Sequence, residues 1–244
     1  MLAGLVRTES DKKETAAHNA DYTDQSKNAQ MLNDNVLEWM LGTVKIADDG
    51  KDTTETPDTY SVLARYYRCL AAPNYTVFSN TTSQAQWIKD NGQQNSSHYV
   101  VSLESPHNAI HLALGGFYEK GEFSGSPVLG ANGDMGDNET AAFDPIFYFH
   151  HCFIDYTFAA WQQLWGLEKR GSLTVIKGYA GTILKEGQPP NFPVGTKIDM
   201  KTLLYPFENS RRELYTSDDM TDLKELGISY VQVPIVSCWI SSVS

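Results

Sequence analysis

The sequence predicts a mainly α-helical fold, a bundle of helices joined by long irregular loops. Apolar residues recur at helical spacing in several separate stretches, most clearly over residues 144–165. The segments between them are rich in Gly, Ser, Asn, Asp and Pro, which favour turns and loops. Only the end of the chain, residues 228–244, favours strand, so we expect at most a little sheet at the edges.

Length and composition predict one globular domain. A chain of 244 residues with 41% hydrophobic and 20% charged residues can bury one sizeable core. Its net charge of −11 argues against nucleic acid or an anionic membrane as a partner, because phosphate binding requires a basic face. No window approaches the ~18 apolar residues of a membrane span. The N-terminus has no adequate signal-peptide core, so we expect an intracellular protein.

The first part of the chain predicts one helix between two irregular segments. Residues 1–25 are polar and without periodicity, which indicates a loose leader. Residues 26–41 carry apolar side chains at helical spacing and stop before Gly42, so they predict a helix. Residues 47–59 are rich in Asp, Thr, Gly and Pro and predict a surface loop.

A second helix is predicted at residues 58–71, with Asp58 or Thr59 as the candidate cap at its start. The following stretch, residues 72–87, indicates a loop and then a short helix or turn. Polar residues, rich in Asn, Gln and Ser, separate it from the next helix.

The middle of the chain predicts the two clearest helices. One runs from Ser105 to a stop at Gly115 and Gly116. A long loop follows over residues 117–142, and loops of this length in a compact domain are usually functional. Asp144 and Pro145, an N-cap carboxylate and a first-turn proline, then begin an aromatic-rich helix that extends to about Trp165.

The remaining segments predict less regular structure. Residues 172–186 have the pattern of another helix, and residues 189–207 predict an extended, proline-rich crossing segment. Residues 217–226 predict a last capped helix. The three cysteines (Cys69, Cys152 and Cys238) are widely spaced, so they predict neither a disulfide framework nor a cysteine metal site, and we expect Cys152 to be a small buried hydrophobe.

Histidine placement predicts a metal site. The chain has six histidines, and His107 and His111 stand four apart, which puts both on one face of a helix. A third nitrogen from His151 or His150 would complete a trigonal platform with one open side. A lone histidine near a core is usually structural, but this combination in a histidine-poor chain favours a metal. Neutral imidazole suits zinc, copper or non-haem iron, so the ligand type does not choose among them.

The residues around these histidines resemble a known family. The segments HNAIH (107–111), MG (135–136) and AAFDPIFYFHHCFID (141–155), followed by Trp161 and Gln162, are similar to the second copper site of the type-3 copper proteins. These are the tyrosinases and catechol oxidases, or polyphenol oxidases, with haemocyanins as oxygen-carrying relatives. The resemblance is nearest to fungal tyrosinases. It implies a helical bundle of the tyrosinase core type, a copper cofactor, and a small phenolic substrate with O2.

The resemblance implies a ligand set and its surroundings. His107, His111 and His151 would bind copper, because the second histidine of the doublet is the ligand in this family. Phe147 shares a helix face with His151 and would pack over the ligand rings. His150 would stand behind the ligands or line the substrate pocket, and a buried, satisfied histidine is the competing interpretation.

Four further residues take expected roles from the resemblance. Glu104 and Asn108 would hold a water molecule able to deprotonate a phenol, although Glu104 could simply complement a helix dipole. Asp155, one turn after His151, is either an orienting partner of the ligands or a solvated surface carboxylate. Asn138 falls where family members place the residue that gates the copper, and it also begins a possible glycosylation sequon.

The resemblance covers only half of a two-copper centre. The family's first site needs three more histidines upstream, and before His107 the chain has only His18 and His98. We therefore expect a partial tyrosinase domain over residues 26–230, with the helices of the first copper site missing, one copper at most, and an irregular tail over residues 231–244. Because the N-terminus looks truncated, secretion also stays open.

Two functions follow from this expectation. One is a copper oxidoreductase that hydroxylates monophenols and oxidises o-diphenols to o-quinones with O2, as in melanin formation. The alternative is a non-catalytic, single-metal fragment or a vestigial paralogue. An oxygen carrier is disfavoured because it also needs both coppers. Loss of one helix pair would bare apolar surface, so we expect poor solubility or self-association, in an oligomeric state that the sequence does not define.

Overall fold

A computed structural model describes the helical centre of the chain and most of its C-terminal part. The described residues are 33, 37, 40, 41, 46–48, 51–53, 61–91, 100–115, 134–136, 138–185 and 192–230. The predicted leader (1–25), most of the predicted helix at 26–41 and the tail (231–244) lie outside them. The domain boundaries therefore stay a prediction.

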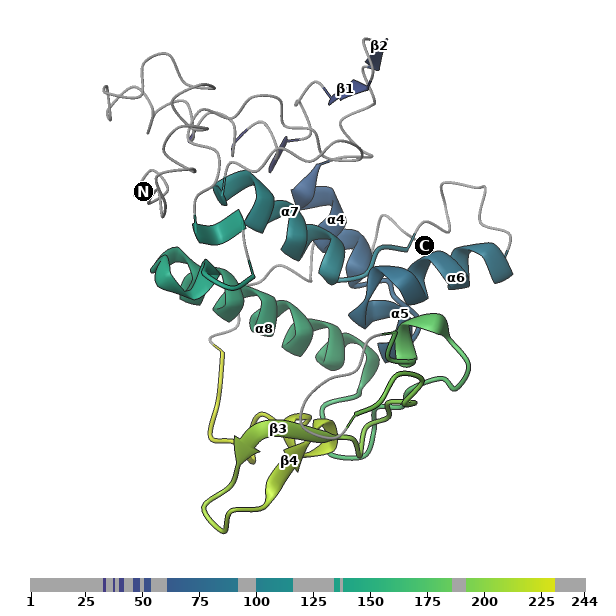
Figure 1. Cartoon of the computed structure of the whole chain (residues 1–244), viewed down its shortest axis with the longest axis vertical. Coiled ribbons are helices and arrows are strands. Elements are labelled where there is room, and N and C mark those ends of the chain that lie inside the picture. The colour runs from purple at the N-terminus through teal and green to yellow at the C-terminus, as the bar shows by residue number, and fades with distance from the viewer. Residues whose placement is uncertain are drawn as a thin grey trace.

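Helices dominate the described part of the chain, which confirms the predicted fold class. They are α4 (Val62–Cys69), α5 (Tyr75–Ser79), α6 (Thr81–Asp90), α7 (Glu104–Gly115) and α8 (Ile146–Trp165). Helix α4 packs on α7, α8 runs alongside α7, and the hairpin of β3 (Leu203–Glu208) and β4 (Leu214–Thr216) lies apart from this helical layer (Figure 1).

The start of α4 differs from its prediction. The helix begins at Val62 rather than near residue 58, and its cap is Ser61 rather than Asp58 or Thr59. The Ser61 hydroxyl accepts a hydrogen bond from the Ala64 amide at 3.2 Å and donates one to the Met40 carbonyl at 2.8 Å. The cap is therefore chosen by a tertiary contact as well as by local preference.

The next stretch forms two helices instead of one short helix or turn. Asn74 caps α5 by accepting from the Val77 amide at 3.0 Å, and Asn80 caps α6 by accepting from the Ser83 amide at 2.8 Å. Gly181 lies so close that a Cβ there would come within 2.1 Å of Asn80 Oδ1. The second cap thus also anchors the chain that returns after α8.

Helix α8 follows its predicted limits closely. The helix begins at Ile146 with Pro145 as its cap, one position later than predicted. Asp144 Oδ1 still accepts from the Ile146 amide at 3.0 Å, so the carboxylate satisfies the start of the helix. Gly166 ends the helix in the left-handed conformation with φ of 67°, which glycine adopts without strain. Both boundary signals are local, which explains why the sequence predicts them well.

Two further predicted helices are wrong. Residues 172–185 are irregular apart from the 3₁₀ turn η4 (Ala180–Thr182), because backbone donors there bond to other helices: the Ile176 amide to Thr76 Oγ1 at 2.8 Å and the Ala180 amide to Gln86 Oε1 at 2.9 Å. Residues 217–226 form only the 3₁₀ turn η5 (Ser217–Met220) and turns. There the Asp222 carboxylate accepts from the Lys224 amide, a local bond that competes with a helix.

The sheets are small and peripheral. Strand β3 pairs antiparallel with β4, which confirms the expectation of a little sheet, and the end of the predicted crossing segment supplies β3. Strands β1 (Ile46–Asp48) and β2 (Lys51–Thr53) form a second antiparallel hairpin. That hairpin falls mostly inside the predicted surface loop at 47–59, so the loop prediction is wrong for its first part.

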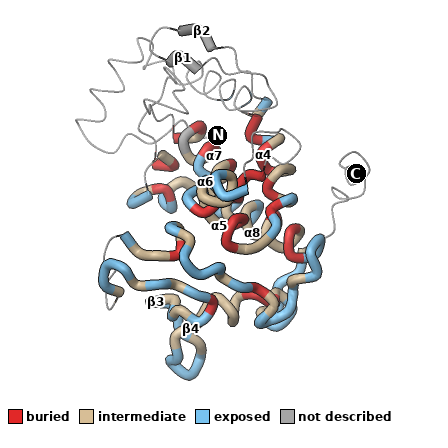
Figure 2. The backbone as a smooth tube through the Cα atoms, turned by 90° about the vertical axis from the view of Figure 1, so that its right-hand side faces the viewer, coloured by how far each residue is buried: buried red, intermediate tan, exposed pale blue. Residues whose placement is uncertain are grey.

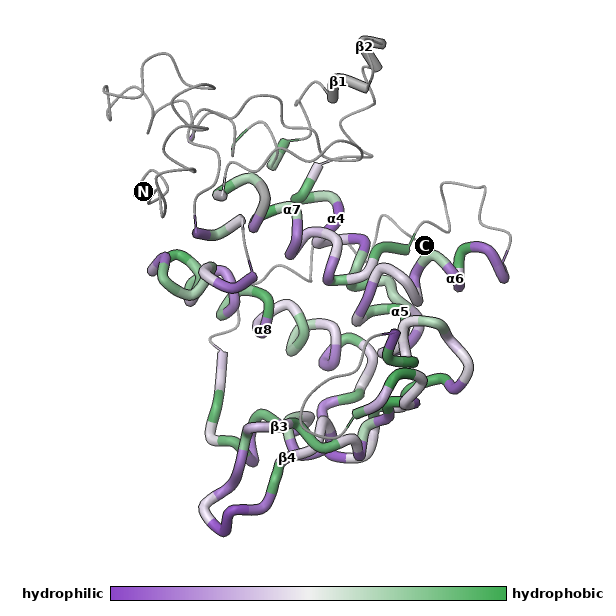
Figure 3. The backbone as a smooth tube through the Cα atoms, in the orientation of Figure 1, coloured by the Kyte–Doolittle hydropathy of each residue, from purple (hydrophilic) through white to green (hydrophobic). Residues whose placement is uncertain are grey.

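Buried residues gather where the helices meet (Figure 2). By contrast, Tyr148, Phe149 and Phe153 on the first turns of α8 are 63%, 73% and 43% exposed, in a helix along which hydrophobic and hydrophilic residues alternate (Figure 3). The described part of the chain therefore carries the bare apolar surface that the sequence predicts. Within these residues no helix combines the length and hydropathy needed to cross a membrane, and the intracellular location stays a prediction.

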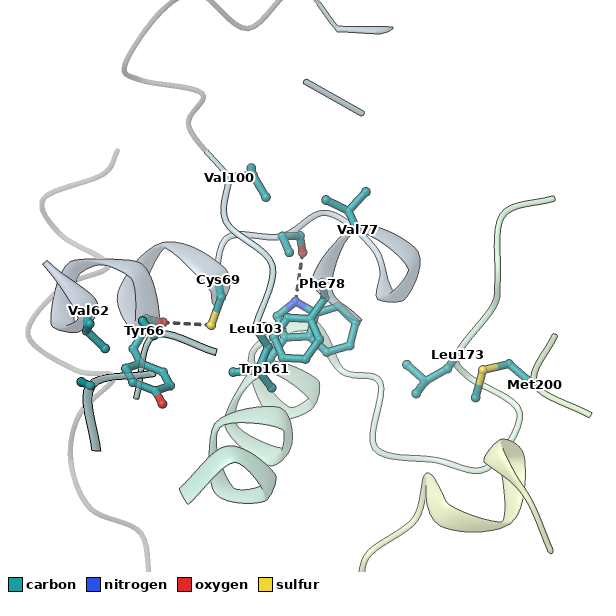
Figure 4. Packing of buried hydrophobic residues seen from close by; sticks show 13 residues of the cluster. Val62, Tyr66, Cys69, Val77, Phe78, Val100, Leu103, Trp161, Leu173 and Met200 are labelled. Atoms are coloured by element: carbon teal, nitrogen blue, oxygen red, sulfur yellow. Dashed lines mark hydrogen bonds between the residues drawn. The ribbon is translucent and has the colours of Figure 1, made fainter. Parts of the chain in front are cut away.

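Trp161 of α8 holds the helices together. Its ring is fully buried and stacks on Phe78 of α5 at a centroid distance of 4.5 Å (Figure 4). Its indole Nε1 donates a hydrogen bond to the Ala72 carbonyl at 2.9 Å, so the large ring is buried without leaving a polar atom unsatisfied. This contact fixes α8 against α5 and the segment that precedes it.

Candidate metal centre

Helices α7 and α8 bring four histidines into one cluster. His107 and His111 lie one turn apart on α7, with ring centroids separated by 4.6 Å. His150 and His151 come from the second turn of α8, and each ring lies within 5.5 Å of both α7 rings. The i, i+4 pair predicted from the sequence thus faces the doublet.

One ring nitrogen of His151 lies close to a ring nitrogen of each α7 histidine. His151 Nε2 lies 3.4 Å from His107 Nε2 and 3.3 Å from His111 Nε2. A metal bound at about 2.0–2.1 Å by trigonal or tetrahedral imidazoles separates their nitrogens by about 3.3–3.6 Å. Within this outer triad, defined as His107, His111 and His151, both separations from His151 therefore suit ligands that share a metal ion.

Hydrogen bonds on the far side of two rings set the tautomer. His111 Nδ1 lies 2.8 Å from the Met135 carbonyl, which can only accept, so Nδ1 carries the proton and Nε2 presents its lone pair. His107 Nδ1 lies 2.7 Å from Asn108 Oδ1, which favours the same arrangement. Both rings are thereby prepared as Nε2 ligands.

The Met135 carbonyl lies beside His111 where a glycine at the end of α7 permits a close approach. Met135 is buried in the 3₁₀ turn η2 (Asp134–Gly136). A Cβ on Gly115 at the end of α7 would come within 2.2 Å of the Gly136 backbone nitrogen. Gly115 thus lets the MG segment approach the end of α7, where the Met135 carbonyl holds the ligand ring, and spacing in the sequence does not reveal this contact.

Burial favours the neutral form of His111 and His151. The pKa of His111 is lowered chiefly by burial, with the neighbouring His107 and His151 adding to this, although its hydrogen bond to Met135 acts in the opposite direction. Burial and His107 also lower the pKa of His151. Neutral imidazole is the form that binds a metal, so these two ligands need not lose a proton near neutral pH.

His150 is the most enclosed member of the cluster. Its side chain is 7% exposed, and burial followed by the three neighbouring histidines lowers its pKa to about 3. The ring stacks on His107 at 5.1 Å and 24°. Nitrogens of His107, His111 and His150 all lie within 4.8 Å of one another, so a second possible triad shares the two α7 ligands. The shorter nitrogen separations favour His151 as the third ligand.

Phe147 lies against the ligands as expected. Its ring centroid is 4.1 Å from that of His151, and it meets the His111 ring edge-on at 6.0 Å. The phenyl ring covers one side of these two imidazoles and restricts their rotation.

Two members of the outer triad, His107 and His151, line a cavity of about 430 Å³ between α5, α7 and α8. The cavity is mainly apolar at its sides and carries two histidines and two carboxylates. Its lining comprises Tyr75, Phe78, Ser79, Leu103, Glu104, His107, His151, Ile154, Asp155 and Phe158. A small aromatic molecule could therefore reach His107 and His151 but would not meet His150.

Glu104 and Asn108 have protein partners in this structure. Glu104 Oε2 accepts from the amide and the hydroxyl of Thr81, at 2.7 and 2.9 Å, at the first residue of α6. The carboxylate thus complements the start of α6, in addition to standing at the start of α7. Asn108 is exposed and its Oδ1 contacts the His107 ring. Both roles predicted for a bound water stay predictions.

Asp155 lies on the cavity, but its described hydrogen bond is not to a ligand ring. Its carboxylate accepts from the Tyr230 hydroxyl, a residue the sequence analysis did not single out and that stands 75 positions away. Burial and this carboxylate raise the pKa of Tyr230. Asn138 is exposed in the turn before η3 (Ala141–Phe143), and Cys152 is exposed, so the prediction of a buried Cys152 is wrong.

Comparison with known proteins gives a consistent result. Residues 6–164 match the common central domain of tyrosinase. The chain is 44% identical to tyrosinase HcTyr2 of Hahella sp. over 94% of its length and 37% identical to a tyrosinase of Aspergillus oryzae over 82%. A solved tyrosinase from Burkholderia thailandensis aligns over 96% of the chain with 40% identity and a TM-score of 0.74.

The chain spans about two fifths of these relatives: 41% of the Hahella protein, 38% of the Aspergillus protein and 42% of the Burkholderia chain. The Hahella match has the higher identity of the two curated sequences, so the predicted nearness to fungal tyrosinases is not confirmed.

Proposed function

This chain belongs to the tyrosinase family, and we propose that it provides one three-histidine copper site of a tyrosinase-type oxidoreductase that acts on small phenols with O2. The observation that carries the proposal is the placement of His151 Nε2, 3.4 Å from His107 Nε2 and 3.3 Å from His111 Nε2, with His107 and His151 lining an open cavity. The remaining histidines of the chain are His18, His98 and the buried His150.

The donor set fits copper. Imidazole is a good ligand for copper, and affinity for divalent metals at nitrogen sites peaks at copper. His107 and His111 are held in the Nε2-ligating form by Asn108 and Met135, and Phe147 limits the rotation of His151. When bound, copper would supply the one-electron redox chemistry that links phenol oxidation to O2.

The cavity supplies the features that a phenol needs. Tyr75, Phe78 and Phe158 offer aromatic surface for a ring, which would then lie beside His107 and His151. A phenol must lose its proton to act as a good ligand, and Glu104 lines the same cavity. We therefore keep Glu104, with Asn108, as the pair that holds a proton-accepting water; release of Glu104 from Thr81 would be part of that step.

Electron counting sets a limit on the chain acting alone. Oxidising an o-diphenol to an o-quinone removes two electrons, whereas a single copper passes one. We propose that the chain binds one copper and completes catalysis only with a complementary three-histidine segment. The exposed aromatic residues of α8 and the open cavity support this part of the proposal, since both would be covered by packing partners.

The test is copper stoichiometry with a matched pair of variants. We expect about one copper per chain after dialysis of the loaded protein, loss of stoichiometric binding in His111→Ala, and no change in His18→Ala. Retained stoichiometric copper in a folded His111→Ala protein would show that the ligand set is wrong. Two coppers per chain would contradict the single-site proposal.

Activity separates the two functions. Oxygen uptake with a catechol should be absent from the copper-loaded chain alone and should appear when a polypeptide with three further histidines is supplied. Persistent inactivity of such a reconstituted, copper-loaded complex would favour the non-catalytic single-metal alternative.

A further inference from the structure

His150 has a buried ring nitrogen that makes no hydrogen bond to the described residues. The side chain is 7% exposed, and its Nε2 has no hydrogen-bond partner within the part of the chain that the structure describes. A buried polar atom without a partner destabilises the folded protein, so such atoms usually meet water, an ion or a ligand. The surroundings of this nitrogen indicate which of these it meets.

The neighbours of His150 are the two metal-ligating rings of α7. Its ring stacks on His107 at 5.1 Å and meets His111 edge-on at 4.9 Å and 80°. The potential ligand atoms of His107, His111 and His150 all lie within 4.8 Å of one another. A shift of a fraction of an ångström per ring would bring them to the about 3.3–3.6 Å spacing of nitrogens around one ion.

Adjacent residues on a helix point about 100° apart, so a doublet normally presents one side chain to a given neighbour. Here both rings of the doublet, His150 and His151, lie beside the His107 and His111 rings of α7. His150 lies on the core-facing side of α8, as do buried Thr157 and Trp161, whereas His151 lies on the cavity side. The His150 and His151 rings remain 5.4 Å apart and nearly perpendicular.

We infer that one copper ion has two overlapping sites in this cluster: the outer triad, and an inner triad of His107, His111 and His150. The inference rests on the proposed copper site and deepens it. Copper in the inner triad sits on the core side, away from the cavity that His107 and His151 line. His150 is then a ligand that retains the ion when binding at the outer triad is disturbed. The metal is also the partner that the buried His150 Nε2 otherwise lacks.

The test compares four proteins by copper(II) titration and by electron paramagnetic resonance of the nitrogen couplings: wild type, His151→Phe, His150→Phe and the double variant. Phenylalanine keeps the ring volume and removes the nitrogens. We expect His151→Phe to keep about one copper with three coupled nitrogens and an affinity lowered about 10–100-fold, the range that disturbed supporting groups produce. The double variant should lose stoichiometric binding.

His150→Phe gives the complementary readout. We expect it to bind one copper through the outer triad but to release it to a chelator several times faster than the wild type. Circular dichroism and thermal melting check folding, and His151→Gln replaces His151→Phe if that variant does not fold.

The outcomes separate the two levels of the proposal. A folded His151 variant that binds no copper, or that retains it with only two coupled nitrogens, overturns the inner site while leaving the outer triad intact. Identical chelator release from His150→Phe and wild type also overturns it. A wild-type protein that binds no copper contradicts the proposed function itself.

Discussion

Two faces of α8 both carry aromatic residues but differ in how far these residues are buried. One face buries Trp161 and His150 against the other helices. Away from that face, Tyr148 and Phe149 are 63% and 73% exposed, although both are aromatic like Trp161. Composition therefore does not decide burial in this helix. What decides it is whether another described element, such as α5 with Phe78, lies opposite.

The largest effect should come from the buried face. Trp161→Ala removes a fully buried ring and its bond to Ala72, so we expect the free energy of unfolding to fall by about 3–5 kcal/mol in urea denaturation. Trp165→Ala is the matched control, because Trp165 stands on the same helix and donates to the Leu70 carbonyl but is 45% exposed. Equal losses in the two variants would contradict the contrast between buried and exposed positions.

The next effect is a pH dependence of the metal-free protein. The pKa of His150 is about 3 in the fold against 6.5 for the free group, so the unfolded chain takes up this proton first. Stability should be complete above pH 6.5 and decline as the pH falls toward 3, by up to about 1.4 kcal/mol per pH unit.

Urea midpoints measured between pH 7.5 and 4.5 check this slope, with chelator present throughout. His150→Phe should show a shallower slope, while His18→Gln should follow the wild type. An unchanged slope in His150→Phe would show that His150 is not held neutral by burial.

A smaller effect is expected at the boundary between the cavity and the C-terminal segment. Tyr230→Phe removes the hydroxyl that donates to Asp155 and leaves the ring in place beside Tyr156. We expect a loss of about 1 kcal/mol in the free energy of unfolding, with no change in copper stoichiometry. A loss of copper would instead make Tyr230 and Asp155 part of the metal site.

The smallest effect on stability should come from the exposed face. Phe149→Gln replaces a side chain that is 73% exposed, so unfolding should change by no more than about 0.5 kcal/mol. Self-association should decrease because an apolar patch becomes smaller. Sedimentation velocity measures this, and a destabilised or equally associating variant would show that the face is already covered in the isolated chain.

Local sequence signals suffice for some features of this fold and not for others. The limits of α8 follow from Asp144 and Gly166, and the pairing of His107 with His111 follows from helical geometry, so both are predictable. The segment at 172–185 has helical spacing but is irregular, because its amides bond to Thr76 and other side chains far away in the sequence. Spacing along the chain carries no information about such partners.

The sequence by itself determined the family, the helical class and the three histidines proposed as ligands, because each depends on residue identity and short-range spacing. Tertiary structure alone decided how the rings are oriented and which neighbours they meet. The Met135 carbonyl lies beside His111 where Gly115 closely approaches Gly136, and His150 lies on the same face of α8 as Trp161, which bonds to Ala72. These contacts join positions distant in sequence, so only packing of the folded chain brings them together.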